Sequence, residues 1–241
     1  MKKCKPFLPH IAAIGGVLAA CLRQWTLSGG VDEKALYPAA HPGWIGYLVL
    51  SAAMALLFLF VSRTESEPAP ECKKVGLALH FLAAIGIFAY SLSSIDPTDL
   101  FQLIVSGFGF ISAAAMLLGL VQQWKKQTLS ALTYALPCLY FVLLMFQSNL
   151  IYGGEPEMIR FLPQFLAVVT AALACYQLWG KAVGLDNEKN RLFWQCLAGY
   201  LCIATLPSNH IMYAFVGAWL LVGAFQMPAT EEVPPEAPVQ E

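Results

Sequence analysis

The chain has 241 residues, of which 58% are apolar and only 12% are charged, and its formal net charge is −1. Soluble domains carry about a quarter charged residues, so this composition is typical of a protein whose solvent is mostly lipid. The charge balance also excludes the basic field that attracts nucleic acid, and we expect no nucleic-acid partner.

Eight apolar segments follow one another along the chain, and each approaches the length of about 20 residues that a helix needs to cross a bilayer. Their apolar residues are continuous rather than alternating, which predicts helices and not barrel strands. The segments are 7–27, 43–61, 75–95, 100–121, 131–151, 161–179, 192–206 and 209–225. The predicted fold is an all-α polytopic transmembrane helix bundle with eight spans.

The spans form one predicted domain over residues 1–227, because the loops between them are too short for a separate soluble domain. Residues 228–241 are acidic and rich in proline, and we expect this tail to be disordered.

The last two segments are separated only by Pro207, Ser208 and Asn209. A single helix over 192–225 would be about 50 Å long, which is too long for one crossing. Pro-Ser-Asn is also a turn signal. Two short crossing helices are therefore predicted, with a re-entrant pair as the alternative.

Basic residues are distributed unevenly between alternate loops, and this bias sets the orientation of a membrane protein. If the N-terminus is inside, every Lys and Arg falls in a cytoplasmic segment except Arg23, Lys34 and Arg160. Both ends of the chain are therefore predicted to lie in the cytoplasm.

The N-terminus has two interpretations. Basic residues at 2–5 precede an apolar stretch that ends in Leu-Ala-Ala-Cys21, which resembles a bacterial lipobox and makes Cys21 a lipidation candidate. Pro9 and His10 interrupt the apolar region, and apolar character resumes after Cys21. These features favour an uncleaved first span.

Arg23 is the one formally charged residue within the eight predicted spans. An Arg at mid-bilayer costs at least about 2.5 kcal/mol, but Arg23 is near the outer end of its span, where the side chain can reach lipid headgroups. The alternative pairs Arg23 with an anionic ligand or an outer acid. The candidate acids are Asp32, Asp96, Asp99 and Glu155.

Three glutamines, Gln102, Gln164 and Gln195, also fall within spans. They either line a substrate cavity together with Arg23 or form hydrogen bonds between helices. Because no Asp or Glu lies in a span, a carboxylate-based proton or cation transporter is disfavoured.

The four histidines fall near the predicted membrane surfaces, His10 and His80 toward the inner side and His41 and His210 toward the outer side. Two histidines on different helices at similar depth can ligate haem or a metal, although a histidine at the interface needs no ligand. The sequence contains neither G-x-S-x-G nor H-E-x-x-H. We predict no catalytic residue and no cofactor, with these histidines as the metal or haem candidates.

Small residues recur at every fourth position in several spans, for example Ala12, Gly16 and Ala20. Such residues let helix backbones approach closely. Packing within the chain is the first interpretation, and a homo-oligomer face is the second.

Short motifs are spread over most of the chain. They are Arg23-Gln24-Trp25, His41-Pro42, Leu136-Pro137, Glu155-Pro156, and Tyr176 with Gly180. In these motifs the chain resembles an uncharacterised family of small multi-spanning membrane proteins of Clostridia-type Gram-positive bacteria. The resemblance implies a multi-pass protein of a bacterial cytoplasmic membrane, and it implies no activity, substrate or site residue.

Three functions stay open. The first is a small transport or accessory membrane component with its site near Arg23 and the glutamines. The second is an intramembrane cofactor protein or enzyme that uses the histidines. The third is a membrane anchor or assembly partner that binds an unidentified membrane protein. The lipid bilayer is a partner in all three, and the sequence favours the first.

Overall fold

The computed structural model describes residues 7–28, 41–63, 73–125, 130–152, 158–208 and 211–225, and this part of the chain is all-α, without strands. Each of the eight apolar segments contains one α-helix, so the predicted all-α fold is confirmed. The elements are α1 (Leu8–Ser28), α2 (Pro42–Ser62), α3 (Lys73–Ser93), α4 (Leu100–Trp124), α5 (Leu132–Tyr152), α6 (Met158–Ala182), α7 (Glu188–Ala204), the 3-10 turn η2 (Leu206–Ser208) and α8 (Ile211–Phe225). The predicted disordered tail lies outside the described residues.

Helices α1 to α6 are long and apolar enough to cross a membrane. Helices α7 and α8 are shorter, with 17 and 15 residues. Large apolar side chains are exposed on the outside of the bundle, including Leu118, Ile14 and Phe60. Surfaces of this kind are stable when lipid covers them, so the helices indicate a membrane protein.

Polar side chains determine where several helices begin. Asp99 accepts hydrogen bonds from the first backbone N–H groups of α4, and Asn187 accepts one from the backbone N–H of Asn190 in α7. Both are N-caps, which satisfy donors that have no partner within the helix. The cap at Asn187 starts α7 one turn before the predicted span at 192.

The connection from α6 to α7 depends on Gly184, which has a φ of 82°. The backbone N–H of Leu185 donates to the Gly180 carbonyl at 2.8 Å, and that of Gly184 donates to Lys181 at 3.1 Å. This is a Schellman ending, in which glycine adopts the left-handed conformation without strain. It lets the chain reverse direction within a few residues.

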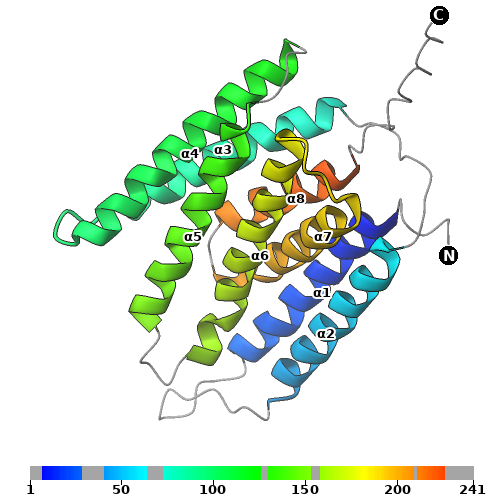
Figure 1. Ribbon diagram of the computed structural model, residues 1–241. Coiled ribbons are helices and arrows are strands. Elements are labelled where there is room, and N and C mark those ends of the chain that lie inside the picture. Colours follow the sequence, from blue (N-terminus) through cyan, green and yellow to red (C-terminus); the bar gives the residue numbers. More distant parts are fainter. Residues whose placement is uncertain are drawn as a thin grey trace, which may run out of the picture.

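Six helices, α3 to α8, form a closed ring, because each packs against the next and α8 packs against α3. Helix α1 packs on α7 and α8, and α2 packs on α1 and α7. In Figure 1, α1 and α2 lie side by side at one flank of the bundle, and α3 and α4 lie at the other. The interior of the ring is therefore surrounded by six different helices.

Small residues bring the ring helices close together. A Cβ at Gly109 of α4 would overlap the side chain of Ser91 in α3, and one at Gly119 would overlap Thr133 in α5. Gly217 of α8 faces the backbone of α7. At these positions the small residues serve packing within the chain.

Candidate functional site

Arg23 lies near the end of α1 and is 4% exposed, so protein encloses most of its side chain. Tyr47 of α2 is one of its electrostatic neighbours. Of the acids considered as its partners, Asp99 caps α4, and Asp96 accepts two hydrogen bonds from Thr98. These bonds stabilise the carboxylate and lower the pKa of Asp96.

The remaining two acids, Asp32 and Glu155, lie outside the described residues. The two candidate acids that the structure describes, Asp96 and Asp99, therefore form hydrogen bonds within the connection between α3 and α4 and the first turn of α4.

The three candidate glutamines have different surroundings. Gln102 donates to the backbone carbonyl of Ser94 at 2.6 Å and closes the connection between α3 and α4. Gln164 of α6 donates to the hydroxyl of Tyr213 in α8 at 3.4 Å. Gln195 of α7 is 1% exposed. Arg23 and the glutamines are thus distributed over four helices in separate environments.

The described histidines also have different surroundings. His10 is exposed on α1, and the Nδ1 atom of His41 accepts a hydrogen bond from Gly43 at the start of α2. His80 of α3 is 1% exposed. His210 lies outside the described residues. Within the described ranges, no group of three His, Cys, Asp or Glu residues could hold a metal ion.

Cys21, the lipidation candidate, is exposed and is a free cysteine. It lies inside α1, which continues for two further turns to Ser28.

Several side chains in the interior of the ring contact helices on the opposite side. The Ser91 hydroxyl of α3 donates to the Tyr140 hydroxyl of α5 at 3.3 Å. The Tyr140 hydroxyl in turn lies 3.9 Å from the sulfur of Met212 in α8. Helices α5 and α8 are opposite one another in the ring, so Tyr140 crosses the interior.

A second group of interior side chains lies about two helical turns away from this contact in α5 and α8, and about three turns away in α3. The rings of Tyr134 in α5 and Trp219 in α8 are nearly parallel, at 12°, with their centroids 6.3 Å apart. The His80 ring of α3 lies 5.3 Å from Trp219. Tyr134 has Arg191 of α7 as an electrostatic neighbour and a hydrogen bond with Gln123 of α4.

We place Gln195 with these side chains from its position on α7 and its neighbour on α8. It is one turn from Arg191, on the same face of α7, and its Nε2 atom would lie 3.1 Å from a Cβ at Gly223 of α8. Gly223 is one turn from Trp219. We call His80, Tyr134, Arg191, Gln195 and Trp219 the ring cluster.

Two members of the ring cluster have polar atoms without a hydrogen-bond partner among the described residues. They are Nε2 of His80 and both amide atoms of Gln195. His80 has a hydrogen bond with the backbone carbonyl of Met116, and because Nε2 has no partner in the described ranges we assign this bond to the other ring nitrogen, Nδ1. Because a carbonyl only accepts, Nδ1 carries the proton, and Nε2 of the neutral imidazole presents a lone pair.

These free atoms are costly for the fold. A buried donor or acceptor without a partner costs about 1–3 kcal/mol, and most buried polar groups in proteins are satisfied by protein or by ordered water. The ring cluster therefore offers one acceptor from His80, and one donor group and one acceptor from Gln195, to a molecule that enters the ring.

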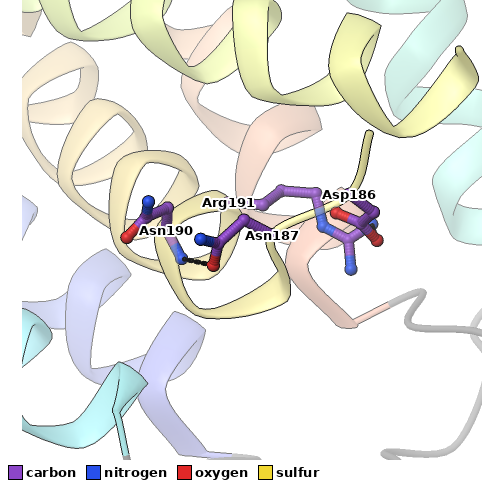
Figure 2. Close-up of polar contacts among 4 residues, drawn as sticks. All are labelled: Asp186, Asn187, Asn190 and Arg191. Atoms are coloured by element: carbon purple, nitrogen blue, oxygen red, sulfur yellow. Dashed lines mark hydrogen bonds and ion pairs between the residues drawn. The ribbon is translucent and has the colours of Figure 1, made fainter. Parts of the chain in front are cut away.

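Arg191 is the charged member of the cluster, and its charge is compensated. Its side chain is 4% exposed, and its Nη1 atom lies 3.1 Å from Oδ2 of Asp186. Figure 2 shows this pair at the start of α7, beside the hydrogen bond between Asn187 and Asn190. Glu188 is a further acidic neighbour of Arg191, and Lys181 is a basic one, so two acids and two bases lie together at this end of α7.

The sequence predicts His80 as a metal or haem candidate and Gln195 as a candidate for a substrate cavity, so it does not predict that the two belong to one site. It does not indicate Tyr134. Trp219 carried a usable signal, because it falls in the middle of a predicted span, away from the interfaces where tryptophan is enriched.

Comparisons with protein-family models, curated proteins and solved structures return no match to this chain.

Proposed function

We propose that this chain is an eight-span transport protein of a bacterial cytoplasmic membrane, with both ends in the cytoplasm, and that a small solute passes through the ring of α3 to α8. The observation that carries this proposal is the set of buried polar atoms of His80 and Gln195 that lack partners in the described residues. They lie inside a ring of helices, which is where helical membrane proteins place polar groups that serve a solute path.

The shape of the last two helices is compatible with eight crossings. At 1.5 Å per residue, α7 and α8 are about 25 and 22 Å long, somewhat less than the hydrocarbon core of about 30 Å. Their directions are opposite, because Gln195 lies beside Gly223 and Cys202 lies beside Gly217. Short spans are accommodated by local thinning of the bilayer at a modest cost.

The interior contacts favour a neutral solute over an ion. The described interior pairs are hydroxyl, amide, thioether and aromatic groups, and the Arg191 charge is paired with Asp186. Removing an ion from water needs charges or many oriented dipoles that replace its hydration shell. Hydroxyl and amide groups are sufficient for a neutral polar molecule.

Solute flux into proteoliposomes tests the transport proposal. We expect vesicles that contain the purified chain to admit small neutral polar solutes faster than protein-free vesicles, as measured by stopped-flow light scattering after an osmotic step. Gln195→Met, which keeps the side-chain length and removes the amide, should reduce the flux. Gly107→Ala is the matched control, because a Cβ there meets nothing within 4 Å.

A flux that equals the protein-free value for every neutral solute would refute transport. An unchanged flux in Gln195→Met would show that the solute does not pass by way of the ring cluster.

Paired topology reporters test the eight crossings. Fusions that are active only inside or only outside are placed after Ser208 and after Glu241. We expect an outside signal at Ser208 and an inside signal at Glu241. An inside signal at both would mean that α7 and α8 form a re-entrant pair.

A further inference from the structure

We infer that the ring cluster is a binding subsite for a small neutral amide, a molecule that carries a carbonyl and at least one N–H group in the same plane. This inference rests on the proposed function, since it names the class of solute for the same site. Three features of the cluster support it: its free donors and acceptors, its charge and its aromatic walls.

The first feature is the pattern of free hydrogen-bonding atoms. Gln195 has both amide atoms without a partner among the described residues, and its side chain is 1% exposed. A carboxamide is complemented most completely by a second amide, because each C=O accepts from the N–H of the other. The free Nε2 of His80 accepts a further N–H, which a primary amide or a urea possesses.

The second feature is the balance of charge. Arg191 is held by Asp186 at 3.1 Å, and its other charged neighbours, Glu188 and Lys181, have opposite charges, so the cation is already compensated. The rest of the cluster consists of an imidazole, an amide and two aromatic rings. A carboxylate or ammonium ligand would lose its hydration without gaining an opposite charge, whereas a neutral amide has a much smaller desolvation cost.

The third feature is the aromatic wall. Trp219 is 6% exposed, and its ring is in contact with the rings of both His80 and Tyr134. Rings in these positions exclude water from the polar atoms beside them, and hydrogen bonds are stronger where water is excluded. A site of this kind rejects an analogue that cannot make the hydrogen bonds, because the buried groups of the site then stay unpaired.

The test measures acetamide binding to the purified full-length chain in detergent, through its thermal unfolding. We expect acetamide to raise the Tm in a saturable manner, as required when a ligand binds the folded state. Acetone retains the carbonyl but lacks N–H, and acetate has nearly the same shape with a negative charge. Each should need at least a tenfold higher concentration for the same shift.

Two variants make the test specific. Gln195→Met should abolish the acetamide shift and should raise the Tm of the ligand-free protein by about 2–12 °C, because it removes a buried amide without a partner. Gly107→Ala should leave the acetamide shift unchanged.

The outcomes separate this inference from the proposed function. If acetamide gives no saturable shift while proteoliposomes still admit another neutral solute, the amide subsite is overturned and transport stands. If acetamide binds but no solute is transported, the subsite stands and transport fails. A ligand-free Gln195→Met that is less stable than wild type, together with no acetamide shift, would show that Gln195 is satisfied by ordered water and would overturn the subsite.

Discussion

The contact between α7 and α8 yields a prediction for Gly217→Ala. A Cβ at position 217 would lie 2.9 Å from the Cβ of Cys202 and 3.1 Å from the backbone oxygen of Gly199, whereas ordinary contacts begin at 3.4 Å. Neither atom can rotate away, because one is main chain and the other is bonded directly to it. The two helices must therefore move apart by several tenths of an ångström.

The expected cost follows from two opposing effects. Overpacking of a tight contact costs about 1–3 kcal/mol, and replacing glycine by alanine in a helix returns up to about 1 kcal/mol. With the full return, the net loss is about 0–2 kcal/mol, which corresponds to a fall in Tm of up to about 8 °C for a chain of this size.

Thermal unfolding of the purified protein in one detergent measures this loss. Gly107→Ala is the control for helix propensity, since position 107 has open space around it, and its Tm should stay equal to wild type or rise. If Gly217→Ala is as stable as Gly107→Ala, the close approach of α7 and α8 is wrong, and the assignment of Gln195 to the ring interior loses its support.

Three further predictions concern polar contacts and are measured by the same unfolding assay. Asp186→Ala removes the carboxylate paired with Arg191 and leaves Glu188 as its acidic neighbour. Since Asp186 is also 34% exposed, the cost should be about 1–2 kcal/mol, below the 3–5 kcal/mol or so of a fully buried pair; Arg191→Met in the same background should recover part of it, and no recovery would contradict the pairing. A double-mutant cycle of Gln164→Leu and Tyr213→Phe should give a coupling of about 0.6 kcal/mol, and strict additivity would exclude the hydrogen bond. Asp99→Ala should cost about 1 kcal/mol through the lost N-cap, whereas Asp99→Asn should retain most of the stability, so equal losses in both variants would argue against capping.

The positions of the helices were largely predictable from the sequence. The predicted span at 100–121 corresponds to α4, Leu100–Trp124, because a long apolar run is bounded by an N-cap at Asp99 and by Lys125. The start of α7 was predicted one turn too late. Its first turn is polar, and hydropathy does not detect a helical turn that is stabilised by the Asn187 cap and the Arg191 ion pair.

The candidate site was predictable only in fragments. The place of His80 and Gln195 in apolar segments was predictable, but their burial was not, because hydropathy does not report the rotation of a helix about its axis or the order of helices around a ring. Tyr134 and Trp219 come from α5 and α8, which are far apart in the chain and face each other across the ring. No local pattern relates two such residues.

The sequence by itself determined that lipid surrounds the protein, that the fold is all-α and where the apolar segments lie. It could do so because the need to satisfy backbone hydrogen bonds in lipid acts on each segment separately. Only the tertiary structure decided which helices close the ring and which polar atoms meet inside it. Those choices depend on side-chain packing between segments that are distant in the chain, where small residues such as Gly109, Gly119 and Gly217 set how closely the helices approach.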